Sequence, residues 1–285
     1  MRQRLARFRD NLPASMRWTL LLGFTAVALF ATALLPRIAQ PKGYHGFADE
    51  RALLGVPYSL NVLSNLPFLL VGLAGVWWIL QRADARHFRD PRERWPAIIL
   101  FTGLVTTAFG SGYYHLFPSN QTLVFDRLGM VVSFGAILPL ALAERVSAKW
   151  GARLLAPSVV LGVALVLHWN YTEMQGAGDL RWYGLYQAYA FLATAGVLLL
   201  TRPTYDRQGG WLLAIGCYAL AKVFELFDKP LYWLTGHGIS GHSLKHVIAA
   251  VGGYFLLRML MERRALAPAP ADERDFPAPQ PALAD

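Results

Sequence analysis

The sequence has little charge and almost no cysteine. Only 16% of the 285 residues are charged and 55% are hydrophobic, whereas ordinary soluble domains have about 25% charged residues. The single cysteine, Cys217, excludes a disulfide framework and a zinc site built from thiolates. The formal net charge is +9, but the basic residues lie in short segments between apolar runs, where membrane topology explains them. We therefore expect no nucleic-acid partner.

Apolar runs close to 20 residues recur along the chain, and a helix of about that length crosses ~30 Å of hydrocarbon. The sequence therefore predicts an all-α, polytopic membrane protein. The apolar stretch after the basic segment 1–17 is longer than a signal-peptide core, so we interpret it as an uncleaved helix. Segment 262–285 is rich in Pro and Ala and is predicted to be disordered. We expect eight spans, at residues 18–36, 57–80, 96–117, 123–143, 152–169, 183–201, 210–228 and 241–261.

The loops between these spans differ in their content of basic residues. With the N-terminus in the cytoplasm, nineteen of the 27 Lys and Arg residues fall on the inner side and five on the outer side. The positive-inside rule therefore predicts that both termini are cytoplasmic. Short outer loops and basic inner loops indicate a bacterial inner membrane, although a eukaryotic endomembrane follows the same rules.

This topology brings polar side chains from several spans to the outer side of the membrane. The last span begins GHSLKH, so His242 and His246 share one helical face. The third span ends on Ser111 and His115, and the fourth begins with Asp126. Three neutral imidazoles suit a catalytic Zn²⁺, which keeps three protein ligands and one position for water. The sequence therefore predicts a zinc site near the outer surface.

The remaining polar residues of this layer suit hydrolysis. Zinc lowers the pKa of a bound water to about 7, and Asp126 could move protons between water and leaving group. Ser111, one turn before His115, could stabilise a developing oxyanion. Three residues of the second span are interpreted as supporting or helix–helix hydrogen bonds, namely Asn61, Ser64 and Asn65.

Other residues have plainer interpretations. A single histidine near a span end is most often interfacial, as we expect of His45, His87, His168 and His237. Small residues permit close helix packing, as we expect of Gly103, Gly110, Gly112 and Gly129. Lys222, Glu225 and Asp228 are three residues apart on one helical face, and we expect them to form an ion-pair network that holds helices together.

The ordered set Ser111-x-x-x-His115, Asp126 and His242-x-x-x-His246 resembles the alkaline ceramidases, a family of the CREST superfamily of seven-helix membrane hydrolases. The stretch NVLSNLPF resembles that family's Asn-x-x-Ser-Asn motif. The resemblance covers residues 57–261 and leaves 18–36 as an additional helix. It implies a seven-helix core with zinc on the three histidines. The implied activity is hydrolysis of the N-acyl bond of ceramide or a related lipid, which yields a long-chain base and a fatty acid.

Three departures from the family limit this inference. Arg127 follows the motif aspartate where the family has an acidic residue, and Lys245 stands between the last two histidines where it has aromatics. Tyr58 occupies the place of an acidic calcium ligand. Asp49 and Glu50 remain nearby, but calcium is doubtful. The headgroup of the substrate can therefore differ from that of ceramide.

Two other functions remain open. A receptor-type or regulatory zinc protein of the same superfamily would keep the metal but show negligible turnover. The presence of both Ser111 and Asp126 favours an enzyme, because a purely structural zinc needs no open position. An ion or proton transporter would depend on the residues of the predicted ion-pair network. In the hydrolase interpretation, a membrane lipid would reach the outer site sideways between helices.

Overall fold

A computed structural model describes residues 12–267 of the chain. Most of the predicted basic segment 1–17 and most of the predicted disordered segment 262–285 lie outside the described residues. Within residues 12–267, the regular structure is helical and no β-strand occurs. Eight of the described helical segments are long and apolar enough to cross a membrane. The predicted all-α polytopic fold is therefore confirmed.

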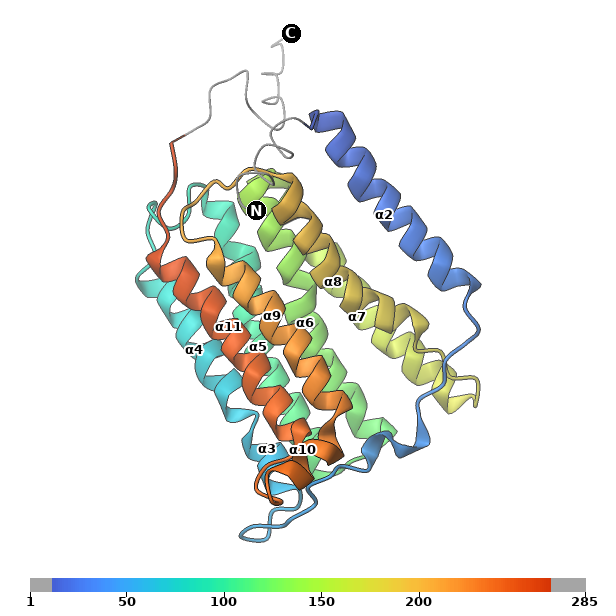
Figure 1. Ribbon diagram of the computed structural model, residues 1–285. Coiled ribbons are helices and arrows are strands. Elements are labelled where there is room, and N and C mark those ends of the chain that lie inside the picture. Colours follow the sequence, from blue (N-terminus) through green and yellow to red (C-terminus); the bar gives the residue numbers. More distant parts are fainter. Residues whose placement is uncertain (1–11, 268–285) are drawn as a thin grey trace.

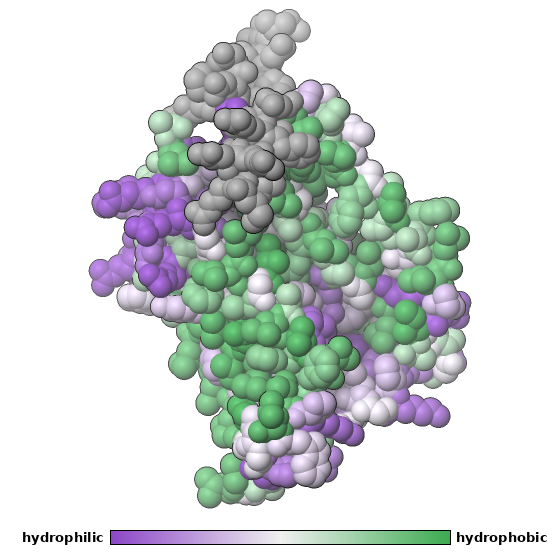
Figure 2. Space-filling model, in the orientation of Figure 1, coloured by the Kyte–Doolittle hydropathy of each residue, from purple (hydrophilic) through white to green (hydrophobic). Residues whose placement is uncertain are grey.

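The spans follow one another in an up-and-down bundle (Figure 1). They are formed by α2 (Ala14–Leu34), α3 with α4 (Ser59–Leu63 and Leu66–Gln81), α5 (Arg94–Leu116), α6 (Asn120–Arg145), α7 (Ala148–Met174), α8 (Arg181–Leu200), α9 (Gly209–Leu226) and α11 (Gly241–Glu262). Three short elements lie between them, η1 (Lys42–His45), η2 (Pro91–Glu93) and α10 (Asp228–Leu234). Apolar side chains cover the middle of the bundle, whereas hydrophilic ones gather towards its two ends (Figure 2).

The second predicted span is broken rather than continuous. α3 ends at Leu63 and α4 begins at Leu66. Pro67 lies in the first turn of α4, where its missing N–H is tolerated but prevents a continuous helix. The Asn65 side-chain amide donates to the Asn61 carbonyl at 2.8 Å, which satisfies an acceptor near the break. The kink places Asn61 and Ser64 deep in the bundle, where both are buried.

The packing leaves α2 and α9 at the periphery. α2 packs chiefly on α8, and α9 packs on α11 and α10, as Figure 1 shows for α2 at the edge of the bundle. α8 itself packs on α6, α2 and α7 rather than extensively on α9. The rings of Phe191 on α8 and Tyr218 on α9 bridge these two helices by stacking, with centroids 3.7 Å apart. Elsewhere the interface between α8 and α9 is open enough to admit a cavity.

Glycines set the closest helix contacts, between α5 and α6. A Cβ on Gly103 would meet the backbone of Ser133, one on Gly110 would meet the carbonyl of Phe125, and one on Gly129 would meet the backbone of Thr106. The predicted packing role is correct for these three glycines. It is wrong for a fourth, Gly112, because no atom lies within 4 Å of its ideal Cβ position.

The end of the bundle opposite the start of α11 is fixed by a buried ion network. Arg263 donates to Glu144 at 2.7 Å and lies 3.7 Å from Glu93, and all three residues are buried. Its guanidinium carbon also lies 3.9 Å from the centre of the Tyr205 ring. The backbone of Leu266 donates to Thr204 at 2.9 Å. The predicted disorder is therefore wrong for residues 263–266, which buried charge pairing and backbone hydrogen bonds hold in place.

Replacing Gly103 with Ala is expected to lower the free energy of unfolding by about 1–3 kcal/mol, the usual cost of overpacking. The added methyl group would meet the Ser133 backbone, which cannot move aside as a flexible side chain can. Thermal unfolding in detergent micelles, followed by tryptophan fluorescence, measures the change.

Gly112→Ala on the same helix is the matched control. Its new methyl group would have no neighbour within 4 Å, and alanine is a better helix former than glycine by about 1 kcal/mol. An equal loss of stability in both variants would contradict the close-packing role of Gly103.

Candidate metal centre

Three histidines come together where α5 ends and α11 begins. His115 lies in the last turn of α5, and His242 and His246 lie in the first two turns of α11. All three are buried, and their ligand nitrogens lie within 4.8 Å of one another. The Nε2 atoms of His115 and His242 are 3.2 Å apart. Two imidazole nitrogens on one tetrahedral Zn²⁺, at ~2.0–2.1 Å each, lie about 3.3 Å apart, so the donor set fits this metal.

A hydrogen-bond chain fixes the tautomer of His246. The Ser64 hydroxyl donates its one hydrogen to the Asn61 carbonyl at 3.0 Å. The contact of 2.8 Å between Ser64 Oγ and His246 Nδ1 must then use an N–H of the imidazole as donor. The Nε2 atom of His246 is left with a free lone pair, which is the form that binds a metal. Ser64 thus orients a candidate ligand, consistent with the supporting role expected of it.

Asp228 fixes the start of α11 from a different element. One oxygen of its carboxylate accepts from the backbone N–H of His242 at 2.8 Å, and the other accepts from the N–H of Ala48 at 2.9 Å. A carboxylate at a helix N-terminus also interacts favourably with the helix dipole. Asp228 was expected in a network with Lys222 and Glu225, and this expectation is wrong. The chain turns into α10 at Asp228, which directs its side chain towards the metal centre.

The loop between α2 and α3 packs on two of the three histidines, His115 and His242. The Phe47 ring packs 4.8 Å from His115 and 4.5 Å from His242, measured between ring centroids. The Tyr58 ring packs against Phe47 edge to face, with ring centroids 5.7 Å apart. Sequence analysis missed Phe47, because a single aromatic residue in a loop carries no periodic signal. The ring excludes water from one side of the imidazoles.

A paired carboxylate holds the same loop. Both oxygens of Asp49 accept hydrogen bonds from the Arg51 guanidinium, at 2.8 and 2.7 Å. Burial raises the pKa of Asp49, but the hydrogen bonds and charge of Arg51 outweigh burial and hold the pKa below its usual value. The backbone carbonyl of Asp49 accepts from Asn61 at 3.4 Å. Asp49, with its carboxylate paired, thus links this loop to α3 through its own backbone and Asn61.

Asn61, Ser64 and Asn65 of the second span make the hydrogen bonds expected of them. Asn61 and Ser64 join the span to α11, and Asn65 stabilises the kink between α3 and α4. Asn61 Oδ1 accepts from the Ser243 hydroxyl at 2.8 Å, which is a helix–helix hydrogen bond of the expected kind. Asn65 bonds within its own segment. Buried polar groups in a membrane bundle are stabilised by such pairing. The start of α11 is thus attached to both α3 and α10.

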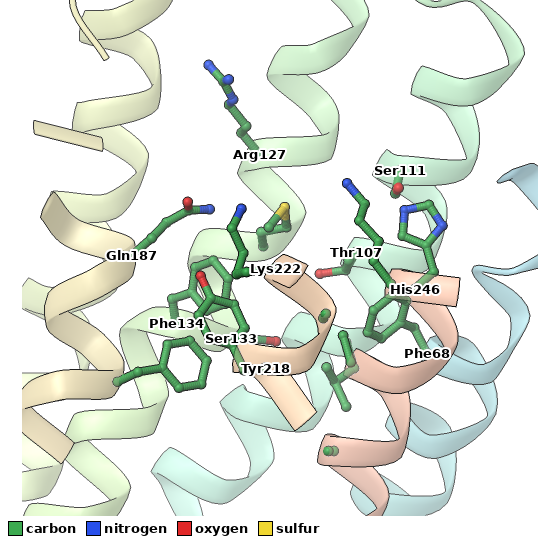
Figure 3. A pocket seen from close by; sticks show the side chains of 18 of the residues that line it. Phe68, Thr107, Ser111, Arg127, Ser133, Phe134, Gln187, Tyr218, Lys222 and His246 are labelled. Atoms are coloured by element: carbon green, nitrogen blue, oxygen red, sulfur yellow. The ribbon is translucent and has the colours of Figure 1, made fainter. Parts of the chain in front are cut away.

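Ser111 and Asp126 lie beside the histidines and face a cavity. Ser111 and Asp126 both line the cavity together with His246. Figure 3 shows Ser111 and His246 side by side at one end of it. The hydroxyl, carboxylate and imidazole that sequence spacing placed in one layer are therefore brought together.

The cavity runs from this polar end into the apolar interior between α8 and α9. Its volume is about 320 Å³. Its far walls are apolar and include Leu100, Phe134, Phe191 and Leu256. Its side walls come from both α8 and α9, the two helices that pack little on each other. The cavity thus connects an apolar space between α8 and α9 with His246, a member of the histidine group.

Several charged side chains lie on the cavity wall near the three histidines. Lys222 pairs with Glu225, as predicted. Lys245, which was not predicted to take part, pairs with the other oxygen of Glu225 at 2.7 Å. Arg127 lies against the Trp169 ring, 3.8 Å from its centre, and donates to Gln40 at 2.7 Å. The two positions at which the chain departs from the ceramidase pattern, Arg127 and Lys245, thus both line the cavity.

The other four histidines take no part in the metal group. His45 bonds Tyr114 at 2.8 Å and Asn120 at 2.9 Å through its two ring nitrogens, so it is a structural residue rather than a plain interfacial one. His87 pairs with Asp84, His168 is exposed on α7, and His237 packs on Trp233. Their exclusion from the metal group agrees with the sequence interpretation.

Comparison with models of known protein families and with curated proteins gives no match.

Replacing Ser64 with Ala is expected to weaken zinc affinity by about 10–100-fold, the usual effect of losing the hydrogen-bond partner of a metal-bound histidine. His246 would lose the acceptor that fixes its Nδ1–H. Competition with a chromophoric zinc chelator measures the affinity.

Ser133→Ala is the matched control, because Ser133 is also buried and also donates to a backbone carbonyl, that of Leu100 at 3.0 Å. Its affinity for zinc should equal that of the wild type. Unchanged affinity in Ser64→Ala would contradict the orienting role of Ser64.

Proposed function

We propose that the protein is a zinc-dependent membrane hydrolase that cleaves the amide bond of ceramide or a related lipid to a long-chain base and a fatty acid. One observation carries the proposal. Three buried histidines lie together, and one of them, His246, lines the polar end of an apolar cavity with the Ser111 hydroxyl and the Asp126 carboxylate. Ligand sites are commonly of this kind, mostly apolar with a few converging polar groups. The resemblance to the alkaline ceramidases supports the same reaction class.

The residues present divide the chemistry among them. His115, His242 and His246 would hold zinc, which when bound supplies an acidified water and polarises the amide carbonyl. Asp126 accepts a proton from the attacking water and returns it to the leaving nitrogen. Ser111 donates a hydrogen bond to the oxygen on which negative charge develops. Phe47 excludes bulk water on the opposite side, which strengthens these interactions.

The apolar walls suit the chain of a membrane lipid. α8 and α9 both line the cavity and pack little on each other, so we infer that a lipid enters sideways between them without leaving the membrane. Its chain then occupies the region of Phe134, Phe191 and Leu256, and its amide reaches Ser111 and Asp126. This arrangement supports membrane lipids as substrates rather than soluble amides.

We propose that the metal centre lies on the outer side of a bacterial inner membrane. α2 begins and α11 ends at the end of the bundle opposite the start of α11 (Figure 1). The loop from Gln81 to Arg94, rich in arginine, lies at that same end. The positive-inside rule then favours a cytoplasmic location for both termini.

The alternatives gain less support. A receptor-type zinc protein would need the three histidines but no carboxylate facing the cavity. A transporter was expected to use Lys222, Glu225 and Asp228, but Asp228 caps the start of α11 instead. Both carboxylate oxygens of Glu225 are occupied by lysines. This leaves the hydrolase as the function that uses every residue of the site.

Asp126→Asn is expected to lower the turnover of lipid amides by about 10²–10⁴-fold, the usual share of general acid–base catalysis. Zinc content should remain that of the wild type, because Asp126 is not among the three candidate ligands. Release of fatty acid from ceramide and from N-acyl amines in mixed micelles measures turnover.

Glu50→Gln, an exposed acid near the same end, is the matched control and should keep full turnover. If a zinc-loaded wild-type protein hydrolyses none of these lipids, the receptor-type alternative replaces the proposal. Ion or proton transport in proteoliposomes that is lost in Glu225→Ala but kept in Asp126→Asn would favour the transporter.

A further inference from the structure

The charged residues on the cavity wall do not balance. They are Arg127, Lys222 and Lys245 on the positive side, and Asp126 and Glu225 on the negative side. The wall therefore has one positive charge in excess, and a divalent metal on the histidines would add to it. Ceramide has no charge that could offset this excess. The composition of the wall points to a ligand with a negative charge.

Glu225 holds the two lysines as a pair without using up their donors. Lys222 binds one of its oxygens and Lys245 binds the other at 2.7 Å. An ammonium group has three N–H donors. Within residues 12–267, Lys222 and Lys245 each make a hydrogen bond only to Glu225, so each lysine keeps further donors. The remaining donors are fixed in position at the cavity wall. They can bind the oxygens of a carboxylate or phosphate.

The position of Lys222 marks the entrance. Its side chain is 54% exposed although it lies on a membrane-spanning helix, where an incompletely paired charge is costly. Figure 3 shows Lys222 on α9 and Gln187 on α8 facing each other across the cavity. The Gln187 amide is itself held by the Tyr183 hydroxyl at 2.8 Å. Between α8 and α9 the cavity wall is therefore polar at the level of Lys222 and Gln187, whereas the stacked rings of Phe191 and Tyr218 bridge the two helices at another level.

A third cation has an unused donor. Arg127 is buried, and its Nη1 has no hydrogen-bond partner in the described structure. The guanidinium is fixed by the Trp169 ring and by Gln40, so it cannot turn away to find one. An anionic ligand in the cavity would be attracted to this charge as well.

We propose that the cavity selects amphiphiles with an anionic headgroup, a carboxylate or a phosphate, which Lys222 and Lys245 bind while the chain fills the apolar part. The refinement of substrate class rests on the proposed function. It assigns to the hydrolase lipid amides with a negative charge on the amine side, such as N-acyl amino acids, in preference to neutral ceramide. The preference for an anion itself does not depend on hydrolysis.

The test is binding rather than turnover. We expect N-oleoylglycine to bind the purified protein at least about tenfold more tightly than N-oleoylethanolamine, which has the same chain and amide but no charge, because hydrogen bonds to a charged group are worth this much. Lys222→Gln should abolish the difference by weakening only the anionic ligand. Quenching of tryptophan fluorescence in a neutral detergent measures both affinities.

Lys149→Gln is the matched control, because Lys149 is exposed at the opposite end of the bundle. It should keep the wild-type preference. Oleate is a second anionic probe that lacks the amide. Tighter binding of N-oleoylglycine than of oleate assigns the anion to the substrate headgroup, and the reverse order assigns it to the fatty-acid product.

Equal affinity for the charged and neutral ligands in the wild type would overturn the proposal. An equal weakening of both ligands in Lys222→Gln would overturn it too. These results are separable from the fate of the proposed function. A protein that prefers anions but hydrolyses no lipid keeps this inference and loses the hydrolase. A protein that hydrolyses ceramide without a preference for anions keeps the hydrolase and loses this inference.

Discussion

A buried imidazole needs a partner for each of its nitrogens, and the end of the bundle where α3, α5 and α11 meet is organised around this need. Leaving one buried polar group unsatisfied costs about 1–3 kcal/mol, and three imidazoles lie together here. Ser64 satisfies Nδ1 of His246, while Nδ1 of His115 lacks a partner in the described structure. The Nε2 atoms of His115 and His242 face each other at 3.2 Å. A metal held by the three rings would be a partner for both facing Nε2 atoms, whereas in a hydrogen bond between them one must donate and the other accept.

The rest of the fold supports that arrangement from a distance. Close contact between α5 and α6 through Gly103 and Gly129 brings His115 and Asp126 to one level. Asp228 fixes the register of α11 by binding the backbone of His242. The weak packing between α8 and α9 leaves space for the cavity. Close packing on one side and a loosely packed interface on the other would suit the proposed hydrolase.

Much of the fold and of the candidate site could be predicted from sequence, for physical reasons. Hydrocarbon thickness fixes the length of a span, so the eight spans are visible in the distribution of apolar residues. Alternating topology then assigns His115, His242 and Asp126 to the same end of the bundle without any knowledge of packing. The spacing of His242 and His246 places both on one helical face. These inferences use only local pattern and connectivity.

What could not be predicted depends on contacts between distant segments. Phe47 covers histidines that follow it by 68 and 195 residues, and Asp228 bonds to Ala48 from across the chain. Lys245 was noted as a departure, but its partner Glu225 lies on another helix. Gly112 cannot be told from Gly110 by its place in the sequence, but no atom lies within 4 Å of its ideal Cβ position. The break before α4 could have been predicted from Pro67, because proline interrupts a helix. A search for continuous apolar runs does not detect it.

The central claim is that the three histidines bind a metal ion. The most direct test is the metal content of the detergent-purified protein, compared with that of a variant with both His242→Ala and His246→Ala. The account predicts about one zinc per chain in the wild type and none in the double variant, with both proteins monodisperse and equally helical. A folded wild-type protein that holds no metal even after zinc is supplied would contradict the account and leave the histidines as packing residues.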